Sequence, residues 1–192
     1  MALKIENNET NTDNSDKQAI TTGNFKGDKI VYAGITHYKY FDCQMSDIVI
    51  VDGMKIHKDC AAAFKKMRDD AKKDRINLKI VSGFRSTEYQ KTIFPKKFAD
   101  KKNPSEKEFV SRLKFSAPSG FSEHHTGFAI DINSLEEDFA DTKEYKWLFE
   151  HAKDYGFEMS FPENNRQGLG FEPWHWRYVG TAKAKNIFRQ AR

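Results

Sequence analysis

The segment that most constrains how this chain folds is SEHHTGFAID, residues 122–131. Within it, large apolar side chains alternate with Ala129 and Asp131, which is the pattern of a strand that has a carboxylate on its less crowded face. Gly127 precedes the strand and allows a turn, so the two adjacent histidines lie just outside it. Two imidazoles and a carboxylate in so short a stretch predict a polar site at the start of a core strand, which a second segment has to complete.

The segment EPWHW, residues 172–176, supplies another histidine and another carboxylate. Catalytic zinc sites use three protein ligands, usually imidazole and carboxylate, and keep a fourth position for water. His124, Asp131 and His175 match that donor set, so we expect them to bind one Zn²⁺ per chain. His125 is the alternative to its neighbour, but adjacent residues point in different directions, and we expect it to stay outside the site.

Two further side chains suit hydrolysis at such a metal. Glu172 is the predicted general base, which has to lie near the attacking water and not on the metal itself. A regular strand would send Glu172 and His175 to opposite faces, so the backbone has to bend near Pro173 or Glu172 has to precede the strand. Arg85 follows a predicted core strand, residues 78–81, and is expected to stabilise negative charge on a substrate oxygen. The alternative for each is an ordinary surface residue.

The composition indicates a globular protein whose core is built largely from aromatic rings. Of 192 residues, 38% are hydrophobic and 14% aromatic, including 16 Phe. The formal charge is +4, but 32 basic residues are interleaved with 28 acidic ones, which excludes nucleic acid as the expected main partner. The sequence has no apolar run long enough for a membrane span and no signal-peptide core at its start. We expect a monomer acting in the cell envelope if an export signal has been removed, with the cytoplasm as the alternative.

The chain is expected to consist of a flexible leader, residues 1–27, and one folded domain, residues 28–192. The leader is rich in Asn, Thr and Asp and carries little apolar surface. The lysine-rich stretch 95–118 is expected to be a surface insertion with a short helix over 105–115. Alternation of helices and strands in one domain favours an α+β fold with an antiparallel sheet. Further helices are predicted over 58–74, 141–155 and 182–192, and strands over 48–51, 78–81, 128–132, 157–161 and 172–179.

The cysteines do not form a recognisable motif. Cys43 and Cys60 are the only two, and their spacing is not that of a CxxC element. Free thiols are the expected state, and a disulfide between them is the alternative. Three further histidines, His37, His57 and His151, have no partner pattern and receive no functional role.

Three motifs follow one another along the chain: Ser82-Gly83-Phe84-Arg85-Ser86-x-x-x-Gln90, Ser122-x-His124-x-x-Gly127-x-Ala129-x-Asp131 and Glu172-x-Trp174-His175-x-x-Tyr178. Together they resemble the VanY-like D-alanyl-D-alanine carboxypeptidase family of zinc peptidases, over approximately residues 45 to 180. The resemblance implies a small α+β domain with a central antiparallel sheet flanked by helices. This fold is shared with lysostaphin-type peptidases and the Hedgehog signalling domain.

The resemblance also implies a role for each matching side chain. His124, Asp131 and His175 would bind zinc, Glu172 would be the catalytic base, and Arg85 would orient the scissile carbonyl and stabilise the tetrahedral intermediate. Four other positions would contact substrate: Ser122, Gln90, Trp174 and Tyr178.

The implied reaction removes the C-terminal D-alanine from a peptidoglycan stem peptide or precursor, by means of a zinc-activated water. Within the same chemistry, the alternatives are an L,D-carboxypeptidase, a D,D-dipeptidase and a phage-type peptidoglycan endopeptidase. A non-catalytic zinc-bearing interaction module is the alternative from another class, and the presence of both Glu172 and Arg85 argues against it. A purely structural zinc would need a fourth ligand, for which His125 and Glu123 are the nearby donors.

Overall fold

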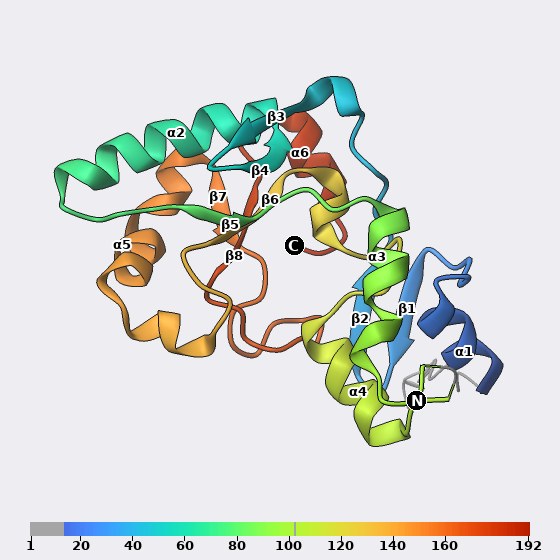
Figure 1. Ribbon diagram of the computed structural model, residues 1–192. Coiled ribbons are helices and arrows are strands. Elements are labelled where there is room, and N and C mark those ends of the chain that lie inside the picture. The colour runs from blue at the N-terminus through green and yellow to red at the C-terminus, as the bar shows by residue number, and fades with distance from the viewer. Residues whose placement is uncertain (1–13, 102) are drawn as a thin grey trace, which may run out of the picture.

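A four-stranded antiparallel sheet at the centre of the molecule positions most of the predicted site (Figure 1). The computed structural model describes residues 14–101 and 103–192. The strand order is β5-β6-β8-β7, and every pairing in this sheet is antiparallel. The predicted α+β class is therefore confirmed. The four strands are β5 (Ile80–Ser82), β6 (Ala129–Ile132), β7 (Phe157–Met159) and β8 (His175–Tyr178).

The register of the central strands places the polar residues on one face. Asp131 of β6 pairs with His175 of β8, and Ala129 pairs with Arg177 two positions along. On the other side of β8, Glu158 of β7 also pairs with Arg177. Directly opposed residues in an antiparallel pair share a face, so these side chains form one polar row across the sheet.

The opposite face of the sheet is apolar and carries the larger hydrophobic core, which we call the main cluster. Ile130, Trp176 and Tyr178 point into it, together with Phe64 and Met67 from a long helix. That helix, α2 (Lys58–Lys73), and α5 (Lys143–His151) lie along the same side of the molecule (Figure 1). The amphipathic pattern predicted for residues 58–74 is confirmed, because its apolar stripe is the buried one.

A tight hairpin leads into α2. It consists of β3 (Ile48–Val51) and β4 (Met54–His57), joined at Asp52 and Gly53, which both have positive φ. Two residues with positive φ form the hairpin turn that matches strand twist, and the sequence Asp-Gly is typical of it. His57 then accepts a hydrogen bond from the Asp59 amide and so caps the first turn of α2.

A second hydrophobic cluster, which we call the wall cluster, packs the remaining elements on the other side of the site. Its buried members include Ile20, Ile30, Phe94 and Phe109. Its helices and strands gather at the right of Figure 1. They are α1 (Asn14–Thr22), β1 (Lys29–Tyr32), β2 (Ile35–Tyr38), α3 (Thr87–Ile93) and α4 (Glu106–Phe115).

The wall cluster corrects two expectations from the sequence. Residues 14–22 of the expected flexible leader form α1, and Ile20 is fully buried, because the helix places its few apolar residues on one face. Residues 1–13 lie outside the described part of the chain. The stretch 95–118 is not a surface insertion, because its aromatic residues fill this second core. The short helix predicted within it is confirmed as α4, which Ser105 caps.

The remaining short elements connect these layers. None of the helices within residues 14–101 and 103–192 has both the length and the apolar character needed to cross a bilayer. Cys43 and Cys60 are free thiols. The connecting elements are η1 (Met45–Asp47), η2 (Pro95–Lys97), η3 (Glu123–Thr126), η4 (Glu137–Asp141), η5 (Ala152–Tyr155) and α6 (Ala182–Ile187).

Replacing Ile20 with Ala tests whether α1 belongs to the folded domain. Because the side chain is fully buried in the wall cluster, the free energy of unfolding should fall by about 2–4 kcal/mol. Urea denaturation followed by circular dichroism measures the change. Gln18→Ala, at an exposed position of the same helix, is the matched control. Equal stability of the two variants would contradict the docked helix.

His37 links β2 to α4 and should make stability depend on pH. Its Nε2 donates to the Leu113 carbonyl at 2.8 Å, and burial lowers its pKa to about 4. The unfolded chain, with an ordinary histidine pKa near 6.5, binds a proton first as pH falls. This contribution is therefore complete above about pH 6.5 and is lost as pH falls toward 4.

We expect the wild-type free energy of unfolding to drop by about 2 kcal/mol more than that of His37→Gln between pH 7 and pH 5. Chemical denaturation at both pH values measures the difference. His151→Gln, at a more exposed histidine outside both clusters, is the control and should follow the wild type. Parallel curves for wild type and His37→Gln would overturn the assignment.

Candidate metal centre

Three buried side chains from three elements converge at the polar face of the sheet. His124 lies in η3, which ends at Gly127, where a φ of 69° turns the chain into β6. Asp131 and His175 are the directly opposed pair of β6 and β8. One ligand-capable atom from each of the three residues lies within 4.8 Å of the other two. Their predicted convergence is thus present in the structure.

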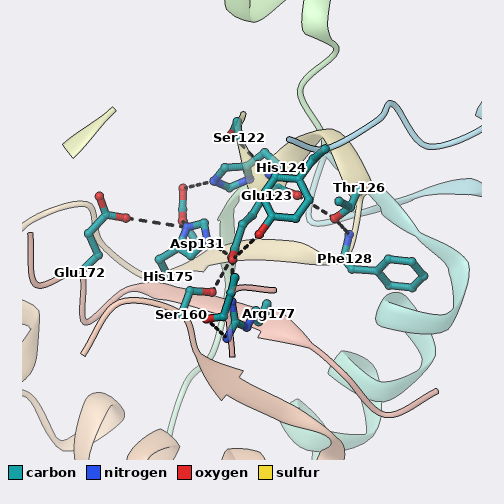
Figure 2. A network of polar contacts seen from close by, with 12 residues as sticks. Ser122, Glu123, His124, Thr126, Phe128, Asp131, Ser160, Glu172, His175 and Arg177 are labelled. Carbon is teal, nitrogen blue, oxygen red and sulfur yellow. Dashed lines mark hydrogen bonds and ion pairs between the residues drawn. The ribbon is translucent and has the colours of Figure 1, made fainter. Parts of the chain in front are cut away.

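The two imidazoles are oriented by hydrogen bonds on the side away from Asp131. His124 donates from Nδ1 to the Gly83 carbonyl at 2.7 Å, which leaves Nε2 facing Asp131 Oδ2 at 3.3 Å. His175 is turned the other way, with Nε2 at 3.1 Å from Glu123 and Nδ1 at 2.9 Å from Asp131 Oδ1. Figure 2 shows both rings beside Asp131. One histidine therefore presents Nε2 to the centre and the other presents Nδ1.

The electrostatics of this group favour a bound cation. Burial and the nearby Arg85 lower the pKa of His124 to about 4, so its ring is neutral and able to ligate. Burial opposes charge on His175, but its contacts with Asp131 and Glu123 outweigh this and raise its pKa to about 10. The same histidines hold the pKa of Asp131 below its usual range, against the effect of burial. The centre thus stabilises positive charge between its carboxylates.

The donor chemistry of the three residues fits a divalent zinc-type cation. Two imidazole nitrogens and one carboxylate oxygen are a ligand set found at catalytic zinc sites, which leave a coordination position open. The nitrogen facing away from the centre is hydrogen-bonded on each ring, as is usual for metal-binding histidines. These observations support all three predicted ligands.

Glu172 lies beside the centre without being part of the group. It precedes β8 in a turn in which its carbonyl accepts from the His175 amide at 3.1 Å. Because Glu172 lies outside the strand, the alternation of faces along a strand does not separate it from His175. Its Oε2 is 3.9 Å from His175 Nδ1. Burial raises its pKa to about 7. The bend required by the sequence spacing is therefore present, and burial gives the carboxylate a pKa suited to proton transfer near neutrality.

Arg85 reaches the same place from the loop after β5. Its amide donates to the His124 carbonyl at 3.2 Å, so the loop is attached to the turn that carries the first histidine. Burial lowers its pKa, while the charges of Asp131 and Glu172 act in the opposite direction. Its buried Nε has no hydrogen-bond partner among the described residues. A cation with an unused buried donor is available to an incoming group.

His125 points away from the metal centre, as predicted. Its Nε2 accepts from the Gly120 amide at 3.1 Å, and its Nδ1 donates to the Arg85 carbonyl at 2.7 Å. The Arg85 amide also donates a hydrogen bond to the His124 carbonyl, so both backbone groups of Arg85 are held by η3. His125 is therefore a structural residue of the loop and not a ligand.

A cavity of about 460 Å³ opens over the centre, between the main and wall clusters. Its lining includes the three ligand-type residues and Glu172, and also Lys97 and Lys114 from the wall side. Of the four predicted substrate-binding residues, three line this cavity: Ser122, Gln90 and Trp174.

The prediction that Tyr178 walls the pocket is wrong. Tyr178 follows His175 by three positions in β8, so its side chain lies on the opposite face of the sheet. There it stacks on Phe128 and packs against Phe157 in the main cluster. The spacing of strand residues alone could have excluded it.

Gln90 lines the cavity and has a side-chain acceptor without a partner in the described part of the chain. Its Nε2 donates to the Ala117 carbonyl at 2.6 Å, which fixes the orientation of the amide. Its Oε1 is buried and has no partner among the described residues. A buried carbonyl oxygen without a donor is costly, so a ligand N–H at this point would be favourable.

A second group with potential metal-binding atoms consists of Cys43, Asp47 and His57, but Asp47 and His57 have other partners. Lys58 and Lys183 contact the carboxylate of Asp47 at 2.8 and 3.2 Å. His57 caps α2, and burial raises the pKa of the Cys43 thiol, which keeps it protonated. This group is therefore an ion-paired helix cap.

The sequence did not reveal the carboxylate that holds His175. The sequence indicates Glu123 only as a nearby donor for a structural zinc, whereas in the structure it is buried and contacts His175, Arg177 and Ser160 (Figure 2). The available signal was the alternation of His175 and Arg177 along one strand, which places both on the polar face.

Comparison with known proteins agrees with this geometry. A profile of the VanY family, described as D-alanyl-D-alanine carboxypeptidase, matches residues 53–181. The chain belongs to this family of peptidases. YodJ of Bacillus subtilis, a carboxypeptidase by name, is 41% identical over 140 residues, which cover 69% of this chain and 49% of YodJ. The D-alanyl-D-alanine carboxypeptidase of Enterococcus faecalis is 33% identical over 127 residues, covering 64% of this chain and 47% of the relative. The chain thus spans about half the length of these relatives.

Solved structures of related peptidases have the same fold. The vancomycin-resistance D,D-pentapeptidase VanY, solved as a mutant with Zn(II), has a TM-score of 0.61 and 30% identity over 78% of this chain and 86% of its own. VanYB in complex with D-alanine-D-alanine has a TM-score of 0.60 and 30% identity over 78% and 84%. The LD-carboxypeptidase LdcB has a TM-score of 0.60 and 33% identity over 88% and 76%. The predicted family and fold are confirmed.

Proposed function

We propose that this chain is a zinc-dependent D-alanyl-D-alanine carboxypeptidase, which removes the C-terminal D-alanine from peptidoglycan stem peptides or their precursors. The observation that carries the proposal is the convergence of three ligand-type side chains with Glu172 and Arg85 at one cavity. The family match and the D-alanine-D-alanine complex of VanYB support the same substrate chemistry.

His124, Asp131 and His175 would hold one zinc ion per chain. When bound, zinc would polarise the scissile carbonyl and lower the pKa of water. Their burial keeps competing water away, and their fixed orientation leaves the cavity side of the centre open for substrate. A non-catalytic zinc module would have no need for a base and an arginine at that opening.

Glu172 and Arg85 would carry the remaining chemistry. Glu172 takes a proton from the attacking water and delivers it to the amine of the departing D-alanine, which requires a carboxyl that exchanges protons near neutral pH. Arg85 lines the cavity and has a donor without a partner among the described residues, and its positive charge would stabilise the carbonyl oxygen, where negative charge develops. Both groups are held by backbone contacts to the ligand-bearing segments.

Ser122, Gln90 and Trp174 would hold the peptide. The Ser122 hydroxyl accepts from the His124 amide at 3.3 Å, which leaves its own hydrogen for a substrate oxygen. The unpaired Oε1 of Gln90 would accept a substrate N–H. Trp174 offers an aromatic surface at the cavity. Together these contacts would fix a short peptide across the cavity.

An L,D-carboxypeptidase is the second candidate, because the similarity to LdcB extends over 88% of this chain. The two activities differ in whether the released D-alanine follows a D- or an L-residue, and the same metal chemistry serves both. We further propose that the protein acts in the cell envelope, where such peptides occur, and that it acts as a monomer.

The activity is tested by incubating the protein with stem pentapeptide, stem tetrapeptide and D-alanyl-D-alanine, and identifying products by mass spectrometry. We expect loss of one D-alanine from the pentapeptide. Preferential cleavage of the tetrapeptide would replace the proposal with the L,D-activity. Internal cleavage would indicate an endopeptidase, and no product from any peptide would reject a peptidase function.

Replacing Glu172 with Gln should reduce kcat by about 10²–10⁴-fold, because proton transfer is lost. Zinc binding should persist, since Glu172 lies outside the ligand group. Steady-state kinetics and metal content measure the two effects. Glu163→Gln, at an exposed position, is the control and should retain activity. Full turnover by Glu172→Gln would contradict its role.

Chelation should abolish D-alanine release, and one equivalent of zinc per chain should restore it. Asp131→Asn should lose zinc, because an amide oxygen carries no charge to offset the cation. Elemental analysis of the purified proteins gives the metal content independently of activity. Asp138→Asn, at an exposed position, is the control. Retention of stoichiometric zinc by Asp131→Asn would contradict the ligand assignment.

A further inference from the structure

The geometry points to Glu123 as a positioning residue for the metal centre: it holds the His175 ring so that Nδ1, and not Nε2, faces Asp131 and the metal. This inference deepens the proposed function and rests on it. His175 lies between the carboxylate of Glu123 and Asp131 (Figure 2), so Glu123 reaches the ligand-type group through this histidine. It acts through the histidine alone.

The contact with His175 is direct and buried. Glu123 Oε2 lies 3.1 Å from His175 Nε2, and both side chains are almost completely inaccessible to solvent. A carboxylate accepts hydrogen bonds and cannot donate them, so Nε2 has to carry the proton. Nδ1 is then the nitrogen available to a metal ion. A flipped ring would lose this bond and place an unpaired polar group in a dry site.

Other donors fix the carboxylate itself. Arg177 Nη1 donates to Oε1 at 2.7 Å, and Ser160 Oγ donates to Oε2 at 2.5 Å. Tyr40 adds a longer contact to Oε1 at 3.4 Å. With both oxygens engaged, Glu123 can neither rotate nor become a fourth ligand. Glu123 is also not among the residues whose ligand atoms converge, which argues against a closed structural zinc site that uses it.

The strands set this arrangement. His175 and Arg177 are two positions apart in β8 and point to the same face, so one carboxylate can bridge both side chains. Glu158 pairs with the opposite edge of Arg177, through Nε at 2.8 Å, and does not contact His175. The guanidinium thus has one partner that contacts the histidine and one that does not. This difference provides a matched pair of variants.

The zinc affinity of Glu123→Gln and Glu158→Gln tests the inference, measured by competition with a chromogenic chelator. Both substitutions remove a carboxylate that binds the same arginine. We expect Glu123→Gln to weaken zinc binding by about 10–100-fold and Glu158→Gln by less than about threefold. Equal losses would assign both residues a general structural role and overturn the inference.

A double substitution separates orientation from fold stability. In Glu123→Gln the amide nitrogen has to face a donor, either Arg177 or the Nε2–H of His175. In Glu123→Gln/Arg177→Met the amide can face the methionine, while its oxygen accepts from His175. Zinc affinity should therefore recover at least in part. Affinity that stays as low as in Glu123→Gln alone would contradict a role through His175.

The zinc-loaded wild-type protein gives a readout that does not depend on any variant folding. Long-range ¹H–¹⁵N NMR should show His175 with its proton on Nε2, protected from exchange, and with zinc on Nδ1. A proton on Nδ1 would overturn the inference. These readouts are independent of peptide cleavage. A protein that passes them but cleaves no peptide would reject only the proposed function, and the converse result would reject only the role of Glu123.

Discussion

The pairing of β6 with β8 is the constraint on which the rest of the site depends. It sets Asp131 directly opposite His175, so two of the three ligand-type side chains are brought together by backbone hydrogen bonds and not by their own attraction. A shift of one residue would send one of them into the apolar core. The main cluster on the other face of the sheet stabilises the register of β6 and β8. If that register shifted by one residue, large apolar side chains of the cluster would have to enter the polar site.

The remaining groups reach this pair from connections that are themselves fixed. η3 brings His124 to Asp131 and Glu123 to Nε2 of His175, because successive residues of a tight helical turn point in different directions. Arg85 is held by two hydrogen bonds to η3. Glu172 is held by the turn before β8, in which its carbonyl accepts from the His175 amide. Preorganisation of this kind matters because a charged group that has to be moved during reaction contributes less than one already in place.

Much of this could be predicted from the sequence, for local reasons. The alternation around Asp131 gave the strand and its polar face, and the spacing of Glu172 before His175 required the bend that the structure contains. What the sequence could not give was long-range packing. The burial of Ile20 in α1 depends on a partner surface far along the chain, and the polar composition around it gave no indication of that surface. The bond between Glu123 and His175 depends in the same way on the register of distant strands.

The cavity between the two clusters has a consequence for how such a protein can vary. The ligand-type residues Asp131 and His175 stand on the sheet side, whereas Lys97 and Lys114 belong to the wall side. His37 and Tyr40 reach the cavity from residues that precede the family match. The cavity lining thus draws on both clusters, with Trp174 and Tyr40 from the main cluster and Phe121 from the wall cluster. If the chain is the proposed peptidase, substitutions on the wall side would reshape the space available to a peptide while Glu172, Arg85 and the ligand-type residues stay unchanged, so selectivity would change separately from catalysis.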